Sequence, residues 1–294
     1  EPKTIEEWFS GILPEKGSIN YPCQIVISIS GLVVDNVVLD SCVEIWGKLD
    51  GAELATRFGV ENVIFLNDIT GAAWGLLSEN TTTEVLNEGK KVESGPIAML
   101  SQGTGTGEAV LLTSPSNGTK FVMTTEMWVA EFPSHTEQEW EIYEFMRKHN
   151  PEHPGVEAAA TIGGNNMKML YYYILSKKDP NVMDNPPEWK TQDVFENPNQ
   201  DPLLDQVKEM YFTALGKEMA VMATKYLPSG GIYLSGGVVE ANVSHVLASQ
   251  QLKDEYFRLA STIPALKDYP IYVVTTPDSV TLSGGIVYAQ TFLI

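Results

Sequence analysis

A short apolar run that ends in two polar residues constrains the fold of this chain most strongly. Residues Val63 to Leu66 are apolar, and Asn67 and Asp68 follow at once. Four apolar residues in a row are typical of a buried strand, and the sequence GAAWGLL after them is typical of a helix. A strand that passes directly into a helix indicates an α/β fold, in which ligands bind beyond the strand ends.

Asp68 has two interpretations from sequence alone. A carboxylate at the end of a buried strand is costly unless it is paired, solvated or used, which makes Asp68 a candidate general base. Asp and Asn are also favoured at helix N-caps, so the same residue is a candidate cap. The two roles are compatible at a strand-to-helix junction, and the sequence leaves both open.

The size and charge of the chain limit the classes of function. Its 294 residues suit two domains better than one, and we expect a smaller domain over 1–95 and a larger one over 96–294. With 19 basic and 38 acidic residues the net charge is −19, which argues against binding nucleic acid or an anionic membrane. No apolar run approaches the roughly 18–20 residues of a membrane span.

The cysteines and histidines show no metal-binding pattern. Cys23 and Cys42 have neither the spacing of metal ligands nor that of a disulfide framework, so we expect a reducing, intracellular compartment. The four histidines lie in polar or helical contexts without metal-ligand spacing. We therefore assign no residue to a metal.

Further elements follow from periodicity and turn signals. A strand over 23–31 is expected to form a hairpin with 33–40, and 121–132 to form a strand, a turn and a second strand. The proline-rich stretch 179–202 indicates a surface loop. Helices are expected over 4–13, 50–59, 135–149, 201–227 and 282–293.

The glycine-rich sequence SQGTGTGEAV, residues 101–110, is the next strongest signal. Glycines at 103, 105 and 107 alternate with threonines at 104 and 106, between two predicted strands. Glycines let a backbone approach a phosphate closely, and threonine hydroxyls can donate to its oxygens. A tight hairpin with solvated threonines explains the pattern equally well. The sequence has neither the lysine of a Walker loop nor the following helix of a dinucleotide fingerprint.

A second glycine pair, Gly236 and Gly237, ends the predicted strand in GGIYLSGGVV. The pair can pack against a nucleoside, but a strand-to-helix turn that needs a positive φ accounts for it better when it is taken alone.

Two acidic residues, Glu126 and Glu157, interrupt otherwise uncharged stretches. In so acidic a chain, each of them is by default a solvated surface residue.

In their order along the chain, these pieces resemble the bacterial-type glucokinase family, from about Tyr21 to the C-terminus. The segments that carry the resemblance are SISG (28–31), AELATRFGVENVIFLNDITGAAWGL (52–76), PIAMLSQGTGTGEAVLL (96–112), GGIYLSGGVV (230–239) and YPIYVVTTPDSVTLSGGIVYA (269–289). The resemblance implies a two-domain actin-like ATPase (ribonuclease H-like) fold with a cleft between the domains.

The resemblance also implies an activity, which is transfer of the γ-phosphoryl group of Mg²⁺-ATP to the 6-hydroxyl of glucose. It places the catalytic base on Asp68 and sugar binding on Asn67, Glu126 and Glu157. The second phosphate loop corresponds to Gly103, Thr104, Gly105, Thr106 and Gly107, and the adenosine region to Gly236 and Gly237.

The chain departs from the family pattern in two places that bear on activity. Nothing before residue 21 matches the family's first phosphate turn, so we expect the first β-unit to be missing from this chain. The family's Gly-Glu-Gly-Gly-His signature reads TEMWV over 125–129, with Trp128 where a glycine is usual. We expect this tryptophan to intrude on a sugar pocket or to rebuild the turn.

Two functions therefore stay open. The first is an ATP-dependent glucokinase that acts on glucose or a related hexose. The second is a catalytically inactive subunit of the same fold, a pseudoenzyme with a structural or regulatory role in a homodimer or a larger assembly.

Overall fold

The computed structural model of the protein describes residues 4–41, 49–103, 105–130, 134–149, 163–164, 166–197, 199–276 and 279–293. The chain divides into two compact units, one formed by Glu1–Thr81 and Thr276–Ile294 and the other by Thr82–Thr275. Each unit has its own strand pairing and its own apolar core.

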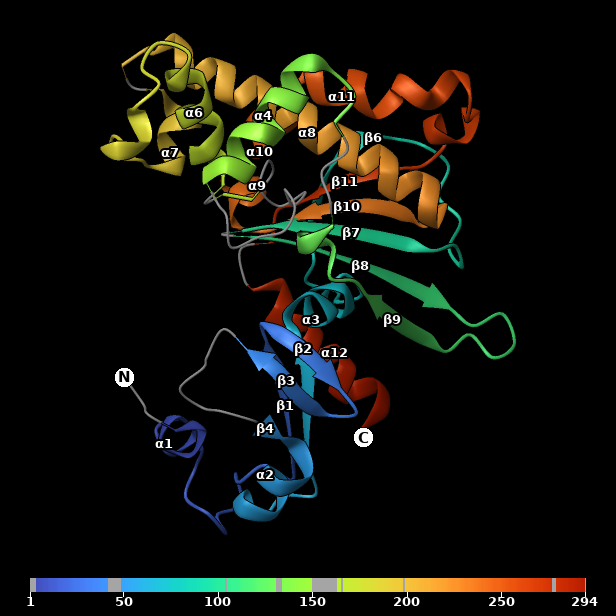
Figure 1. The fold of residues 1–294 in the computed structure, drawn as a ribbon. Helices are drawn as coiled ribbons and strands as arrows, with labels where there is room; N and C mark the ends of the chain where they lie inside the picture. Colours follow the sequence, from blue (N-terminus) through green and yellow to red (C-terminus); the bar gives the residue numbers. More distant parts are fainter. Residues whose placement is uncertain are drawn as a thin grey trace. The chain divides into compact units, whose positions relative to one another are not determined.

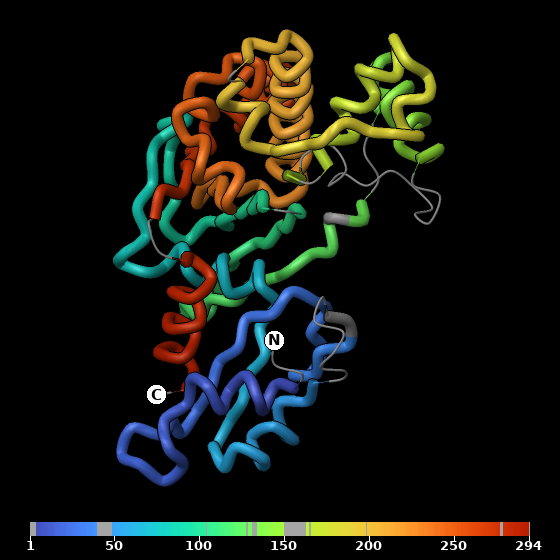
Figure 2. Tube along the Cα trace, turned by 90° about the vertical axis from the view of Figure 1, so that its left-hand side faces the viewer, coloured from blue at the N-terminus to red at the C-terminus, as the bar shows by residue number. Residues whose placement is uncertain are grey.

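The smaller unit contains elements from both ends of the chain. These are α1 (Ile5–Ser10), β1 (Gln24–Ile29), β2 (Gly31–Val34), β3 (Val37–Ser41), β4 (Leu49–Asp50), α2 (Gly51–Phe58), β5 (Asn62–Asn67), α3 (Asp68–Gly75) and α12 (Val280–Phe292). Figure 2 shows the red C-terminal helix α12 beside the blue N-terminal part of the chain. Its contacts are with α3 and β1.

The unit boundaries differ from the expected division into 1–95 and 96–294. Residues 82–95 include β6 (Thr83–Asn87), which pairs antiparallel with β11 (Ile271–Val274) and therefore belongs to the larger unit. Helix α12 returns to the smaller unit because it packs on α3. Both differences arise from contacts between segments that are far apart in the sequence.

The strand pairing in the smaller unit corrects one expectation. Strand β1 pairs in parallel with β5, from Gln24 with Asn62 to Ile29 with Asn67, and not with residues 33–40. Those residues form their own hairpin, β2 with β3, as part of the sheet β2–β3–β4. The two turn residues, Asp35 and Asn36, have φ values of 49° and 63°. Two consecutive positive φ values are what a tight hairpin turn requires.

Local signals for the helices of this unit are confirmed. Asp50 caps α2 by accepting hydrogen bonds from the backbone of Ala52 and Glu53, and Gly59 ends the helix in the left-handed conformation (φ 72°). A small apolar core lies among α1, α2 and the two sheets, where Ile5, Phe58 and Val63 are buried.

The larger unit consists of one six-stranded sheet and the helices that connect and follow its strands. Its strands are β6, β7 (Ile97–Gln102), β8 (Thr106–Thr113), β9 (Lys120–Thr124), β10 (Gly231–Ser235) and β11, in the order β6–β11–β10–β7–β8–β9. Its helices are η2 (Met127–Val129), α4 (Glu137–His149), α6 (Met167–Ser176), η3 (Val182–Asp184), α7 (Thr191–Glu196), α8 (Pro202–Tyr226), α9 (Gly237–Ala241), α10 (Val243–Ala248), α11 (Gln250–Phe257), η4 (Arg258–Ser261) and η5 (Pro264–Lys267).

Helix α8 organises the core of the larger unit. Figure 1 and Figure 2 show α8, with the helices packed on it, on one side of the six-stranded sheet. Its predicted apolar positions Val207, Tyr211 and Leu215 are fully buried. They pack with residues of the central strands, such as Leu100 and Leu234, in one large apolar cluster.

Two expectations for the larger unit are wrong. A second strand was expected directly after the turn in 121–132, but β9 ends at Thr124 and Met127–Val129 form the 3₁₀ turn η2, while residues 131 and 132 lie outside the described residues. Residues 179–202 are not only loop, since they contain η3 and α7, and α7 buries Val194 and Phe195 in the core of this unit. Among the helices of the described part, none combines the length and the apolar character needed to cross a bilayer.

Candidate functional site

The junction between β5 and α3 places the candidate base in the smaller unit. Asn67 ends β5 and is the N-cap of α3, because its Oδ1 accepts hydrogen bonds from the backbone of Ile69 (3.0 Å) and Thr70 (3.4 Å). Asp68 is the first helical residue, and its side chain is exposed. The cap is therefore Asn67 rather than Asp68. Asp68 is exposed at the end of a buried strand, and its Oδ1 accepts a hydrogen bond of 2.9 Å from the backbone of Ile69.

Asn67 also ties this junction to the neighbouring hairpin. Its Nδ2 donates a hydrogen bond of 3.0 Å to the carbonyl oxygen of Gly31, at the start of β2. An amide side chain has two N–H donors, and the bond to Gly31 uses one of them. The expected sugar contact of Asn67 remains a prediction, and it relies on the other N–H group.

Close packing holds α3 in place. A Cβ atom at Gly71 would lie 2.4 Å from the Oγ of Ser28 on β1, and one at Gly75 would lie 2.0 Å from the carbonyl oxygen of Val280 on α12. Only glycine allows these approaches. The helix that begins with Asp68 is thus wedged between β1 and α12.

In the larger unit, the glycine-rich turn is shorter than the sequence suggested. Strand β7 ends at Gln102 and β8 begins at Thr106, so the turn is limited to residues 103–105. The Gly103 N–H donates to the carbonyl oxygen of Gly105 (3.0 Å). A Cβ atom added at Gly103 or Gly105 would meet no atom within 4 Å. No described residue therefore covers the Cα of Gly103 or Gly105 on the side where a Cβ atom would lie.

Thr106 and Gly107 correct the expectation that they belong to this open turn. Both lie in β8, where Gly107 pairs with Ser101. The Thr106 side chain is buried, and its Oγ1 points into the protein. It cannot present its hydroxyl to a phosphate outside the turn, because strand alternation directs it to the interior face of the sheet.

The second glycine signal lies next to the turn. Strand β10 runs parallel to β7, with Ser235 opposite Ser101, so the C-terminal ends of the two strands are adjacent. Gly236 has a φ of 94°, and a Cβ atom there would lie 2.4 Å from the carbonyl oxygen of Gln102. The prediction of a strand-to-helix turn with positive φ is confirmed. The structure also brings both glycine signals to one edge of the sheet.

Two residues near this edge had not been singled out from sequence. Gly164 donates its N–H to the carbonyl oxygen of Gly103 (2.9 Å), which brings the segment before α6 to the turn. Glu240 accepts hydrogen bonds from the Gly236 N–H and the Ser235 Oγ, both at 2.9 Å. The glycine pair at 163–164 was the available signal for the first contact, and no local pattern signalled the second.

Glu126 lies in an exposed position directly before η2. The next residue, Met127, is buried in the large apolar cluster of the unit, and the Val129 side chain is exposed. Thr125 joins this segment to β8, because its N–H (3.2 Å) and its Oγ1 (3.1 Å) both donate to the carbonyl oxygen of Glu108. Residues Met127–Val129 of TEMWV thus form a 3₁₀ turn that the buried Met127 anchors.

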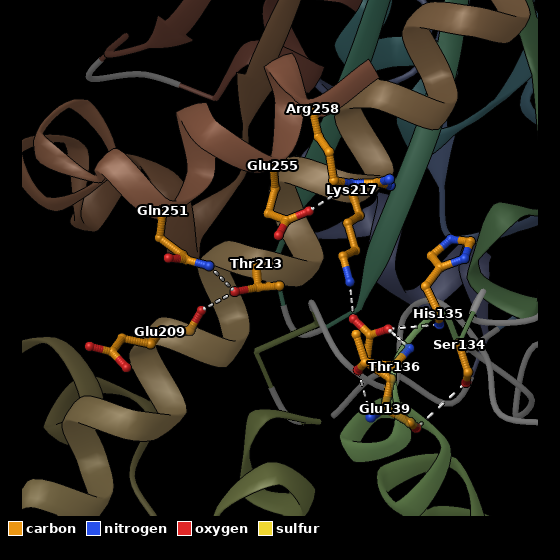
Figure 3. A network of polar contacts seen from close by, with 10 residues as sticks. All are labelled: Ser134, His135, Thr136, Glu139, Glu209, Thr213, Lys217, Gln251, Glu255 and Arg258. Atoms are coloured by element: carbon orange, nitrogen blue, oxygen red, sulfur yellow. Dashed lines mark hydrogen bonds and ion pairs between the residues drawn. The ribbon is translucent and has the colours of Figure 1, made fainter. Parts of the chain in front are cut away.

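A buried ion pair follows this segment, as Figure 3 shows. Lys217 of α8 contacts Glu139 of α4, and both side chains are at least nine-tenths buried. Glu139 also accepts hydrogen bonds from the backbone of His135 (2.8 Å) and Thr136 (3.0 Å), while its own N–H donates to Thr136 Oγ1 (3.2 Å). This is a capping box, and its T-x-x-E pattern was readable from sequence.

The charge of Lys217 decides the ionisation of Glu139. Burial alone raises the pKa of this carboxyl group, but hydrogen bonds from Lys217 and from the backbone lower it by more, so the net pKa is below its ordinary value. The ionised pair therefore fixes the start of α4 on α8.

The predicted site is partly outside the described residues. Thr104 and Glu157 lie there, and so does the expectation for the Trp128 side chain, so these stay predictions. In the described part of the chain, no group of three or more His, Cys, Asp or Glu side chains is placed to hold a metal ion. The remaining predicted residues fall into two sets, one in each unit, at Asn67–Asp68 and at the glycine turns with Glu126.

Comparisons with known proteins show the family of the chain. A family model described as Glucokinase matches residues 2–292. The glucokinase of Nostoc punctiforme is 22% identical over 283 residues, which cover 90% of this chain and 81% of the relative. The glucokinase of Synechocystis sp. is 27% identical over 232 residues, which cover 72% of this chain and 64% of the relative.

Solved structures show the same fold. A glucokinase from an Antarctic psychrotroph matches with a TM-score of 0.78 at 18% identity, over 98% of this chain and 86% of that one. Glucokinase from Balamuthia mandrillaris, solved in complex with glucose, matches with a TM-score of 0.74 at 19% identity, over 90% and 77% of the two chains. These proteins have the actin-like ATPase fold, so the expected fold class is confirmed.

Proposed function

Because the chain belongs to the glucokinase family, we propose that it transfers the γ-phosphoryl group of ATP to the 6-hydroxyl of glucose, with Asp68 as the base. The observation that carries this proposal is the position of Asp68. Its carboxylate is solvent-exposed at the first residue of α3, directly after a buried strand. Packing of α3 between β1 and α12 holds the helix from which this side chain extends.

The proposed phosphoryl transfer requires little covalent chemistry from the protein. Phosphoryl transfer depends mainly on positioning and charge stabilisation, and a carboxylate near the attacking hydroxyl accepts its proton. In this proposal Asp68 takes that proton. Asn67 donates its second N–H to a sugar hydroxyl, and Glu126 and Glu157 accept hydrogen bonds from hydroxyl groups, which carboxylates do well.

The glycine turns of the larger unit fit the phosphates and the nucleoside of ATP. An added Cβ atom at Gly103, Gly105 or Gly237 meets nothing within 4 Å, so a ligand can approach the backbone at all three. Backbone N–H groups in such a turn attract phosphate oxygens. When bound with ATP, Mg²⁺ would neutralise part of the negative charge of the phosphate oxygens.

One observation favours the second candidate, a catalytically inactive member of the family. Residues 127–129 form a 3₁₀ turn whose Met127 is buried, at the positions where the family has two glycines and a sugar-binding histidine. A histidine that binds a hydroxyl contributes on the order of 1–3 kcal/mol of discrimination, which valine cannot supply. Under this alternative the protein binds sugar weakly or not at all, and acts as a subunit of a homodimer or a larger assembly.

A coupled assay of glucose phosphorylation with Mg²⁺-ATP separates the two functions. For the kinase we expect turnover in the wild type and a loss on the order of 10²–10⁴-fold in Asp68→Asn. Asp35→Asn is the matched control, because Asp35 is an exposed aspartate of the same unit in a hairpin turn that asparagine tolerates. Wild-type turnover that Asp68→Asn leaves unchanged would exclude Asp68 as the base. Absence of turnover, together with no thermal shift on adding glucose, would exclude the kinase and leave the inactive subunit.

A further inference from the structure

The six-stranded sheet of the larger unit has two edge strands, β6 and β9, which differ in how they are protected. An edge strand carries unpaired backbone N–H and C=O groups, and proteins usually guard it with charges, proline or bulges. Strand β6 is guarded twice, because its pairing with β11 shifts register between Ile271 and Tyr272, and because it carries the exposed Glu84. A second strand is therefore discouraged from pairing with β6.

Strand β9 lacks these protections (Figure 1). Its sequence, KFVMT, contains neither proline nor an acid, and its pairing with β8 keeps one register over all five residues. Its one charged side chain, Lys120, turns back to β8, where Nζ donates to Thr113 Oγ1 (3.2 Å). Among the strands that the structure describes, β9 pairs with β8 alone, so its outer edge remains available to another strand.

The pairing with β8 determines which backbone groups of β9 point outward. Residue pairs in an antiparallel ladder alternate between pairs that exchange hydrogen bonds and pairs that do not. At one end of this ladder Thr125 donates its N–H to the carbonyl oxygen of Glu108 (3.2 Å). At the other end Ser114 donates to the carbonyl oxygen of Thr119 (2.8 Å). Both pairs continue the register of β8 and β9, so they determine which residues between them bond inward.

Counted in steps of two from either end, Phe121 and Met123 form the inward bonds to β8. The alternate residues Lys120, Val122 and Thr124 therefore direct their N–H and C=O groups away from β8. The side chains alternate as well, so Phe121 and Met123 lie on one face of the sheet and the other three on the opposite face.

The Phe121 and Met123 side chains form an exposed apolar pair. Met123 pairs with Val110, which pairs with Ala98 of the core that α8 covers, so the exposed pair lies on the α8 side of the sheet. Phe121 is nevertheless 48% exposed and Met123 is 42% exposed. The described helices thus leave much of both side chains in water, directly beside the free edge.

A second copy of the same strand matches this edge when the two run antiparallel with Val122 opposite Val122. In that register Lys120 of each copy lies opposite Thr124 of the other, so every outward N–H and C=O group of both strands gains a partner. Phe121 of each copy lies beside Met123 of the other on one face, as cross-strand neighbours do. A shift by two residues would leave the outward groups at one end of each strand unpaired.

The charge distribution also favours this edge for a contact between like copies. The chain has a net charge of −19, so two copies repel each other over most of their surface. Residues 109–125, which include most of β8 and all of β9, contain no acid and one lysine. The repulsion is therefore weakest where the two strands would meet.

We propose that the protein forms a symmetric dimer in which β9 of one copy pairs antiparallel with β9 of another, centred on Val122. The same patch meets itself, so the contact closes as a dimer and does not propagate. Because one pair of strands is a small interface, we expect a reversible dimer with a dissociation constant in the micromolar range or weaker. The dimer does not depend on whether the protein phosphorylates glucose.

Analytical ultracentrifugation of the full chain over a range of concentrations tests the proposal. We expect the mean mass to rise from that of one chain toward that of two, and more readily as salt screens the repulsion between the copies. Val122→Pro should weaken dimerisation by at least about tenfold, because proline removes the central outward N–H and its ring obstructs the approach. The fold should persist, since proline is tolerated on an edge strand where the N–H faces outward.

Thr83→Pro is the matched control on the opposite edge. Thr275 donates its N–H to the carbonyl oxygen of Thr82 (2.9 Å), so Thr83, the next residue, points its own N–H away from β11 in the same way. This variant should dimerise as the wild type does. If Val122→Pro does not fold, Val122→Lys takes its place, because it sets two cations opposite each other and should also weaken the dimer.

Hydrogen exchange shows whether the contact lies at β9. Raising the protein concentration should slow amide exchange in the peptide 119–125 of the wild type, and should leave it unchanged in Val122→Pro. A chain that stays monomeric at every concentration and salt level would overturn the proposal and leave this edge to a strand of another protein. A dimer that persists unweakened in both Val122→Pro and Val122→Lys would place the interface elsewhere and overturn it equally.

Discussion

The carbonyl oxygen of Gly71 lies 1.7 Å from the point that a Cβ atom on Gly284 would occupy. Helix α12, from the end of the chain, therefore touches the backbone of α3, the helix that begins with the candidate base. The contact also includes the Gly75 N–H group, 2.6 Å from the same point. The position of Asp68 thus depends on two glycines more than two hundred residues apart in the sequence.

Gly284→Ala should destabilise the protein by about 1–3 kcal/mol, because the added methyl group forces α12 away from α3. Gly285→Ala is the matched control on the next residue. There the added Cβ would meet only Val26 Cγ1, at 3.8 Å, so we expect unchanged or slightly higher stability from the better helix propensity of alanine. Urea unfolding of both variants checks this, and equal losses in the two would contradict the packing argument.

Gly236→Ala should destabilise the larger unit by about 1–3 kcal/mol, since φ is 94° and the Cβ atom would enter the backbone of Gln102. Gly237→Ala should leave the melting temperature unchanged, because its Cβ meets nothing within 4 Å. If a nucleotide approaches this backbone, Gly237→Ala should nevertheless weaken ATP binding in calorimetry. A loss of stability in Gly237→Ala would show that the turn is packed differently.

Asn36→Gly should cost about 1–3 kcal/mol although glycine accepts the positive φ of this turn position. The Asn36 side chain donates to the carbonyl oxygen of Val63 (2.8 Å) and accepts from the N–H of Phe65 (2.7 Å), so its removal strips two hydrogen bonds from β5. Asp35→Gly changes the neighbouring exposed turn residue and should cost much less. Thermal unfolding of the two variants separates side-chain bonding from turn conformation.

Lys217→Met should be among the more damaging single changes, at about 3–5 kcal/mol, because it leaves Glu139 buried and charged without its cation. Adding Glu139→Gln should recover part of that loss, since the amide oxygen keeps the capping bonds without the charge. Lys208→Met, on the same helix, removes an exposed pair with Asp205 and should cost no more than about 0.5 kcal/mol.

The same pair predicts a pH dependence. In the wild type the pKa of Glu139 is lowered, so the stability that the pair contributes is lost as the pH falls through that value. In Lys217→Met the carboxyl group has no cation and its pKa rises, so the cost of the substitution should shrink on the acid side. Urea unfolding at pH 5 and pH 7 measures the difference. A cost that is independent of pH would contradict the role of the ion pair.

Sequence patterns predicted the parts of this protein that depend on neighbouring residues. The apolar spacing of α8, the left-handed stop of α2 at Gly59 and the strand-to-helix junction at Asn67–Asp68 all involve groups within a few positions of one another. Periodicity and capping act over that range, so the residues themselves determine these elements.

Only the tertiary structure decided which distant segments meet. It paired β1 with β5 rather than with the following hairpin, and it returned α12 to the smaller unit. It also placed the Thr106 side chain in the interior and buried the acids Glu108 of β8 and Glu218 of α8. Pairing and burial depend on contacts across tens to hundreds of residues, and no local pattern encodes the partner. The sequence by itself therefore determined which carboxylate stands at the strand end, and the packing decided which acids are buried.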